Sequence, residues 1–143
     1  MVCAKTETFL VTFSGSPRSI RRRGNQLFHV TLPPLAAGTR SHYLKLRDRA
    51  QYEFALASSA VVAQVSGGRI QRVRIAFGGV GTKPWRSREA EKVLEGQEAS
   101  AENFSRAADA AMANAKPLKF NAFKIELAKR ALIRSLTNTT QAA

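Results

Sequence analysis

The chain has 143 residues, of which 44% are hydrophobic and 8% aromatic, and this is enough for one domain with a single core. One cysteine and two histidines exclude an internal disulfide and a four-ligand zinc site, and no apolar run reaches the roughly 20 residues that cross a bilayer. The net charge of +13 is the most unusual bulk property, since basic proteins attract the phosphates of nucleic acids.

The positive charge is concentrated near the start of the chain. Residues 1–50 hold nine basic and two acidic residues, and Arg18, Arg21, Arg22 and Arg23 lie in a stretch that also contains serine, glycine and proline. Only residues 8–13 resemble a strand there. The composition predicts a basic, poorly ordered extension over residues 1–26, and it favours a flexible tail over a nucleic-acid-binding arm. Because no signal peptide is recognisable, we expect a cytoplasmic location.

Two short strands are predicted next. Residues 27–32 alternate between apolar and polar positions and stop at Pro33 and Pro34, which cannot donate backbone hydrogen bonds to a sheet. Residues 34–41 are then expected to form a connector. Residues 43–46 alternate again and precede a charged turn, which indicates a second strand.

A hairpin is predicted in the middle of the chain. Residues 53–65 are apolar with interspersed alanine and serine, a pattern that fits a helix or a strand. The Ser-Gly-Gly sequence at 66–68 is typical of a tight turn, and residues 69–77 alternate cleanly. We therefore interpret the pair as an antiparallel hairpin, with Glu53 and Phe54 inside its first strand.

Three helices are predicted after the strands. Ser87 is placed to cap a helix over residues 88–94 that ends at Gly96, and Ser100 to cap one over residues 101–115. Asn121 starts a third, with Phe123, Leu127 and Ala131 toward the core. This order predicts an α+β fold in which helices cover one face of an antiparallel sheet.

No catalytic or metal-binding constellation is recognisable. The glycine-rich run at 78–83 matches neither a Walker loop nor a Rossmann fingerprint, so we interpret it as a turn that permits close packing. His29 and His42 are isolated and are expected to be packed or solvated. Trp85 is expected in the core or at an interface. The acidic residues on the helices are interpreted as partners in surface ion pairs: Glu89, Glu91, Glu95, Glu102, Asp109 and Glu126.

From Val30 onward the sequence resembles a known family. The segments are VTLPP at 30–34, YLKLRDRAQYEFALASSAVV at 43–62, VRIAFGGVGTKPWRSREAE at 73–91 and NAFKIELAKRALIRSL at 121–136. They are similar to the C-terminal domain of the FAD-binding medium subunit of molybdenum hydroxylases, the family of xanthine dehydrogenase, aldehyde oxidoreductase and carbon monoxide dehydrogenase flavoproteins. The resemblance implies a small antiparallel sheet of three to four strands covered by three helices, formed by residues 27–143.

The resemblance also implies a role in an oxidoreductase complex. In this family a molybdenum cofactor on a large subunit oxidises the substrate, and iron-sulfur clusters on a small subunit pass electrons to FAD. The flavin then reduces an acceptor. The main FAD-binding domain of the family is N-terminal and has no counterpart in this sequence, so the chain alone is not expected to be catalytic.

Two family contacts to FAD have counterparts in this sequence. The resemblance implies that Leu27 touches the flavin nucleotide and that Lys45 lies near the isoalloxazine ring, where a cation stabilises reduced flavin. An ordinary exposed lysine at a strand edge is the alternative for Lys45. Tyr52 is expected in the core, with stacking near the ring as an alternative.

The expected partners are the large and small subunits and the missing FAD domain, contacted through the helices and the loop at residues 78–85. Exposed interdomain surface also predicts self-association. The alternative function is a basic nucleic-acid-binding module, although aromatic residues are not interleaved with the basic ones.

Overall fold

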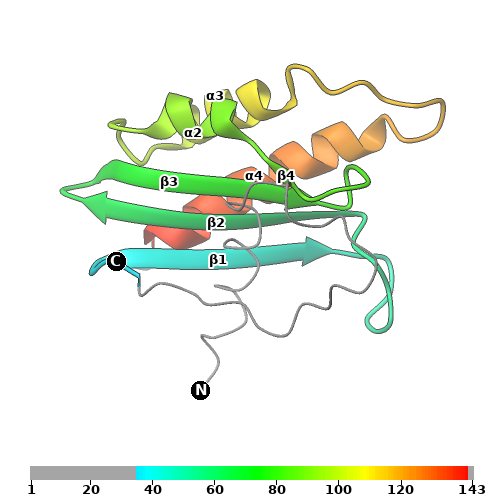
Figure 1. Ribbon diagram of the computed structural model, residues 1–143, viewed down its shortest axis with the longest axis horizontal. Coiled ribbons are helices and arrows are strands. Elements are labelled where there is room, and N and C mark those ends of the chain that lie inside the picture. The colour runs from blue at the N-terminus through cyan, green and yellow to red at the C-terminus, as the bar shows by residue number, and fades with distance from the viewer. Residues whose placement is uncertain (1–34, 142–143) are drawn as a thin grey trace, which may run out of the picture.

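The computed structural model describes residues 35–141, which form a sheet with helices on one side (Figure 1). The strands are β1 (Thr39–Leu46), β2 (Ala57–Ser66), β3 (Arg69–Gly78) and β4 (Trp85–Arg86). The helices are α2 (Arg88–Leu94), α3 (Ala101–Met112) and α4 (Phe123–Gln141). The predicted α+β fold is confirmed. The expectations for residues 1–26, the strand at 27–32 and His29 lie outside the described residues.

The sheet has the simplest antiparallel topology. Its order is β1-β2-β3-β4, and every neighbouring pair is antiparallel. The β2–β3 hairpin turns at Gly67 and Gly68, whose φ angles of 57° and 75° lie in the left-handed region that glycine adopts without a steric penalty. The predicted hairpin is therefore confirmed, including the strand interpretation of its ambiguous first arm.

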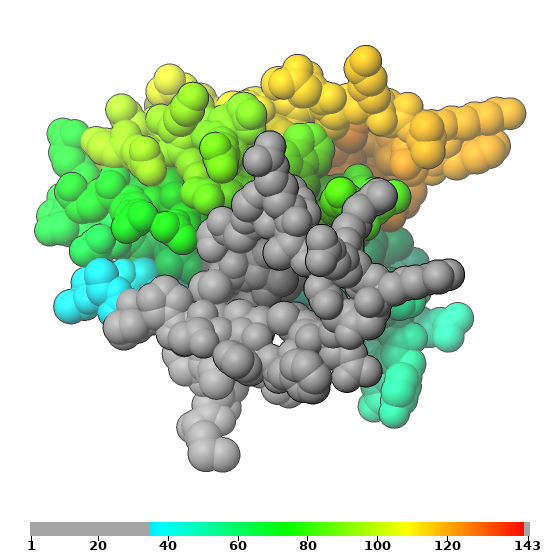
Figure 2. Space-filling view, in the orientation of Figure 1, coloured from blue at the N-terminus to red at the C-terminus, as the bar shows by residue number. Residues whose placement is uncertain are grey.

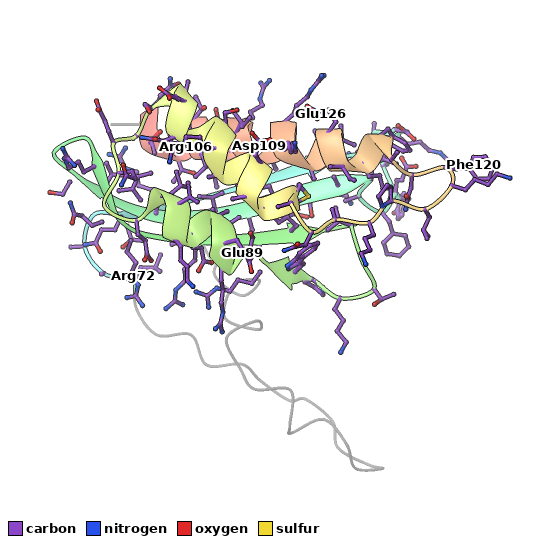
Figure 3. All side chains as sticks on the ribbon, turned by 90° about the horizontal axis from the view of Figure 1, so that it is seen from above. Arg72, Glu89, Arg106, Asp109, Phe120 and Glu126 are labelled. Atoms are coloured by element: carbon purple, nitrogen blue, oxygen red, sulfur yellow. The ribbon has the colours of Figure 1, made fainter. Side chains whose placement is uncertain are left out.

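The helices cover one face of the sheet in two layers. α4 lies along β1 and β2, α2 lies against β3, and α3 packs on both helices (Figure 1). Seen from above, the helices lie on one side and Arg72 points away from them (Figure 3). Strand side chains alternate between faces, so every second residue of β2 and β3 enters the core. The largest fully buried core residues are Phe77, Ile70, Ile75, Leu94, Leu132, Leu136, Val61 and Val73.

Several predicted boundaries differ from the observed ones. β1 begins at Thr39, inside the expected connector, because its first residues pair with Gln64 and Ala63 of β2. β2 begins at Ala57, and Phe54 is 94% exposed in the preceding loop. β4 was not predicted. It has only two residues, which are too few to show a periodicity.

The helix predictions hold best at the capped ends. Ser87 and Ser100 are the N-caps of α2 and α3, where their hydroxyls accept from the amides of Ala90 and Asn103. The far ends are less well predicted. α3 stops at Met112 rather than at residue 115, and α4 starts at Phe123, whose ring is 55% exposed rather than in the core.

Candidate functional site: the helix-free face of the sheet

The candidate site lies on the side of the sheet opposite the helices. In antiparallel strands, residues directly opposite each other point to the same face. No helix of residues 35–141 covers this side, which we call the helix-free face. Its residues are Tyr43, Lys45, Ser58, Ala60, Val62, Arg74, Ala76, Gly78 and Arg86.

Lys45 is exposed near the end of β1 and is held by the loop that follows. Its Nζ donates to the backbone carbonyl of Glu53 at 2.6 Å, and the Glu53 carboxylate accepts from the amide of Arg49 at 2.5 Å. Because an ammonium group has three donors, this contact orients Lys45 and leaves donors for another acceptor. The structure therefore presents Lys45 as a positioned cation on the helix-free face.

The surface beside Lys45 is made of small residues. Lys45 pairs with Ser58, which pairs with Gly78 in the next strand. A Cβ atom at Gly78 would lie 2.6 Å from the Ser58 hydroxyl, so a larger residue there would displace that side chain. Ala60 and Ala76 form the adjacent row. These side chains are small but buried, since Ser58, Ala60 and Ala76 are 3%, 0% and 1% exposed, so Lys45 is the accessible polar group of this part of the face.

The other residues singled out in the sequence, Leu27, Tyr52 and His42, have different outcomes in the structure. Leu27 lies outside the described residues, so its contact with the flavin nucleotide stays a prediction. Tyr52 is fully exposed with φ 49°, so its expected place in the core is wrong, because it lies in the loop between β1 and β2 rather than in a strand. His42 is half-buried on the helix side, where its Nε2 lies 3.2 Å from Asn138 Nδ2, as expected of a packed histidine.

The glycine-rich loop packs closely, as predicted. Gly79 has φ 74°, and a Cβ atom there would lie 2.5 Å from the carbonyl oxygen of Ala55. The Gly79 carbonyl accepts from Lys124 Nζ of α4 at 3.1 Å. The loop therefore joins the β1–β2 loop to the start of α4.

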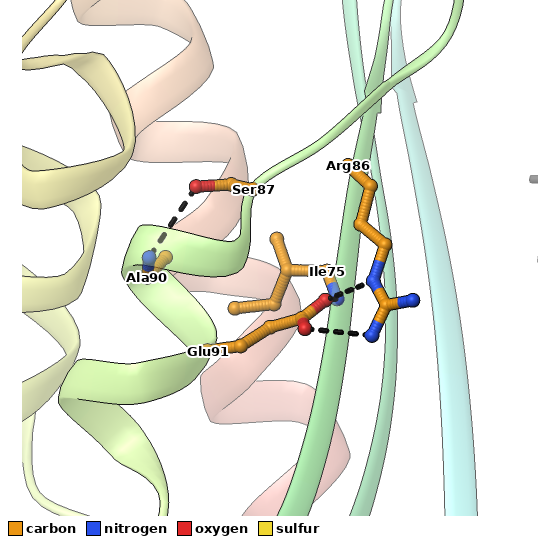
Figure 4. Close-up of polar contacts among 5 residues, drawn as sticks. All are labelled: Ile75, Arg86, Ser87, Ala90 and Glu91. Atoms are coloured by element: carbon orange, nitrogen blue, oxygen red, sulfur yellow. Dashed lines mark hydrogen bonds and ion pairs between the residues drawn. The ribbon is translucent and has the colours of Figure 1, made fainter. Parts of the chain in front are cut away.

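The prediction of a surface ion pair is wrong for Glu91, and Glu89, Glu95 and Glu102 also have no ion-pair partner among residues 35–141. Glu91 is buried, and its two oxygens accept from Nε and Nη2 of Arg86 at 2.8 Å each, while Oε1 also accepts from the amide of Ile75 at 2.9 Å (Figure 4). The side-chain hydrogen bond to Glu91 raises the pKa of Arg86 above its ordinary value. Burial lowers this pKa, whereas the negative charges of Glu91 and Glu95 raise it further. This pair ties α2 to β3 and β4.

Asp109 and Glu126 do form exposed ion pairs, with Lys129 at 2.7 Å and Arg130 at 3.7 Å. Both acidic residues lie on the helical side (Figure 3).

In residues 35–141, no cluster of three His, Cys, Asp or Glu side chains is placed to hold a metal ion. The same residues include no helix with the length and apolar character of a membrane span.

The family model of the CO dehydrogenase flavoprotein C-terminal domain matches residues 42–139. The chain belongs to this family. The match includes Lys45, all of α2 and α3, and α4 except its last two residues. The resemblance seen in the sequence therefore agrees with the fold.

The flavoprotein C-terminal domain has characterised relatives. The chain is 41% identical to the aldehyde oxidoreductase FAD-binding subunit PaoB of Escherichia coli over 76% of its own length and 31% of that subunit. It is 33% identical to the glyceraldehyde dehydrogenase medium chain of Sulfolobus acidocaldarius over 59% of its length and 30% of that chain. The chain thus spans about a third of these proteins.

Solved structures show the same fold. A chain of carbon monoxide dehydrogenase from Hydrogenophaga pseudoflava superposes with a TM-score of 0.71 at 34% identity, over 78% of this chain and 39% of that one. The structural comparison therefore supports the same fold as the sequence match, that of the flavoprotein C-terminal domain with its four-stranded sheet and three helices.

Proposed function

We propose that the chain supplies the C-terminal domain of the FAD subunit of a molybdenum hydroxylase-type oxidoreductase. Residues 27–143 form this domain, and residues 1–26 are a basic extension. The domain supports electron transfer from iron-sulfur clusters through FAD to an acceptor. The family match and the similarity to an FAD-binding subunit support this proposal, whereas no comparison supports a nucleic-acid-binding module.

The observation that carries the proposal is the position of Lys45. The helix-free face offers a cation held by the Glu53 carbonyl beside a row of small residues, Ser58 and Gly78. Lys45 suits an anionic group, because its exposed ammonium keeps N–H donors for a further acceptor. FAD, when bound, supplies the electron-carrying chemistry that the described side chains lack.

Lys45 is proposed to donate to the isoalloxazine and to stabilise negative charge on it. A preorganised cation costs little reorganisation when charge develops nearby, and the hydrogen bond to Glu53 provides that preorganisation. Leu27 is proposed to touch the nucleotide part of the flavin. The chain is proposed to act only together with the main FAD-binding domain, a molybdenum-cofactor large subunit and an iron-sulfur small subunit, and it performs no catalysis alone.

A fusion experiment tests the proposal. The N-terminal part of PaoB that this chain does not match is joined to the full chain, and bound FAD is measured from its visible absorbance. We expect the fusion to retain FAD. A folded fusion that purifies without flavin would contradict the proposal.

The role of Lys45 is tested in the same fusion by Lys45→Met. Losing a hydrogen bond from a charged donor costs about 1.4 kcal/mol, so the flavin potential should fall by about 30 mV. The control is Lys92→Met, which removes an exposed lysine from α2 and should leave the potential unchanged. Equal potentials in both variants would show that Lys45 does not contact the flavin.

A further inference from the structure

Exposed large hydrophobic residues gather at one end of the molecule. Seven are exposed among the described residues, and five of these lie in two loops or beside them. Tyr52 and Phe54 of the β1–β2 loop are 102% and 94% exposed, and Leu118, Phe120 and Phe123 of the α3–α4 connection are 75%, 82% and 55% exposed. Such grouping is unusual, because exposed apolar side chains on monomeric proteins are normally scattered.

The two loops are linked through the glycine-rich loop at residues 78–84. The backbone of Gly79 lies against Ala55 and Leu56 of the β1–β2 loop, and its carbonyl accepts from Lys124 at the start of α4. Both loops protrude at the same end of the molecule, the β1–β2 loop in teal and the α3–α4 connection in orange (Figures 1 and 2). Phe120 projects beyond the rest of the domain (Figure 3). We call residues 47–56, 78–84 and 113–124 the loop end.

The loop end contains a hollow that fits an apolar side chain. The cavity has a volume of about 180 Å³, and its lining is mixed. The apolar side chains are Val80, Trp85, Met112, Ala115, Pro117 and Ile125, and the polar ones are Asn114, Lys116, Asn121 and Lys124. By volume alone, about 150 Å³ is enough for a group the size of benzene. One leucine or aromatic side chain from a partner can therefore enter it.

The charge of the loop end selects the kind of partner. Its three segments hold six basic residues and two acidic ones. The Nζ of Lys119 lies 5.2 Å from the centre of the Phe120 ring, so positive charge and apolar surface occur together. Two copies of this surface would repel each other, whereas an acidic protein surface would be attracted.

We propose that the loop end docks an acidic surface of another protein subunit, which inserts an apolar side chain into the hollow. The proposal deepens the proposed function and rests on it, since the partner is a second subunit of the same oxidoreductase complex. A protein fits the hollow better than an anionic membrane does, because a bilayer has no projecting side chain to fill it.

The experiment uses the full chain co-produced with the molybdenum-cofactor and iron-sulfur subunits encoded in the same genome. Phe120→Ser and Lys119→Glu remove the apolar and the charged contact, and Ala115→Leu fills the hollow without changing the charge. Each should weaken binding of the subunit by about 10-fold or more, as expected at the centre of an interface. The control is Arg72→Glu, which reverses an exposed charge on β3 outside the loop end and should leave binding unchanged.

We also expect the affinity to fall as salt rises from about 0.05 to about 0.5 M, because salt screens attraction between charged surfaces.

The outcomes separate this proposal from the proposed function. If the unaltered chain assembles and all four variants bind equally well, the loop end is not the interface, while the proposed function stands. If the unaltered chain does not assemble with either subunit, both proposals fail.

Two further results would overturn the choice of partner. Concentration-dependent self-association that Phe120→Ser abolishes would identify a second copy of this chain as the occupant. Co-sedimentation with phosphatidylglycerol vesicles that Lys119→Glu abolishes would identify an anionic lipid surface.

Discussion

Glu91 holds the junction of α2, β3 and β4 through three hydrogen bonds. Its carboxylate is 7% exposed, whereas the Arg86 guanidinium is 29% exposed. A buried carboxylate is costly unless its oxygens are satisfied, and here both oxygens have partners. Because the pKa of Arg86 is raised above an already high value, the stability from this pair is fully present below that range and is lost only in strong alkali.

Replacing Glu91 should destabilise the domain. In Glu91→Ala the amide of Ile75 loses its side-chain acceptor and Arg86 its partner, and breaking a buried ion pair of this kind costs about 3 kcal/mol. Urea denaturation followed by circular dichroism measures the loss. Glu89→Ala changes an exposed residue of the same helix and should alter stability by less than about 0.5 kcal/mol. Equal effects of the two variants would refute this account of Glu91.

At the scale of elements, the loop between β3 and β4 depends on a close approach of two backbones. Gly79 and Gly68 have nearly the same left-handed conformation, with φ 74° and 75°. They differ in their surroundings. A Cβ atom on Gly68 would meet nothing within 4 Å, whereas one on Gly79 would clash with the Ala55 carbonyl.

This contrast separates backbone strain from a steric clash. Gly68→Ala should cost about 1–2 kcal/mol, the penalty for a left-handed conformation with a side chain. Gly79→Ala should cost clearly more, because the β1–β2 loop must also move. The free energies of unfolding of both variants test this difference. If Gly79→Ala costs no more than Gly68→Ala, the β1–β2 loop can move aside without a measurable loss of stability.

Local signals predicted the elements and missed what depends on distant neighbours. The α2 range, both serine caps and the hairpin follow from residues within a few positions of one another. β4 and the first half of β1 exist because a neighbouring strand offers hydrogen bonds, which a short sequence window does not reveal. Phe54 and Phe123 are apolar residues at loop and helix ends, where hydrophobicity alone wrongly indicated burial.

The candidate site was only partly predictable for the same reason. Lys45 was identified through resemblance, and its hydrogen bond to Glu53 depends on the shape of the β1–β2 loop. The burial of Glu91 depends on Ile75, which is 16 residues away and adjacent only in the folded sheet. The hollow is lined by residues from two parts of the chain, 80–85 and 112–125. No spacing pattern in the sequence predicts that these segments lie next to one another in the fold.

At the scale of the whole molecule, one hydrophobic core connects the sheet to all three helices. It runs from Ala57 and Val61 in β2 to Phe104 in α3 and Leu136 in α4. Each part of this core is completed by another element. The described domain should therefore unfold as one unit rather than in pieces.

A variant in α4 tests this cooperativity. Leu136→Ala removes a fully buried side chain and should lower the free energy of unfolding by about 2–5 kcal/mol. The fluorescence of Trp85, the single tryptophan, and far-UV circular dichroism should shift to the same lower midpoint. Arg134→Ala, at an exposed position of α4, is the control and should leave both midpoints in place. Separate midpoints in the Leu136 variant would indicate independent units.

The position of α4 in the chain has a consequence for how the protein is made. Synthesis proceeds from the N-terminus, so the ribosome completes all four strands before α4, which alone among the helices lies along β1 and β2. Until that helix emerges, the apolar side of these two strands has no cover. Nascent chains at this stage should be the form most in need of chaperones, and slow translation through residues 123–141 should increase aggregation.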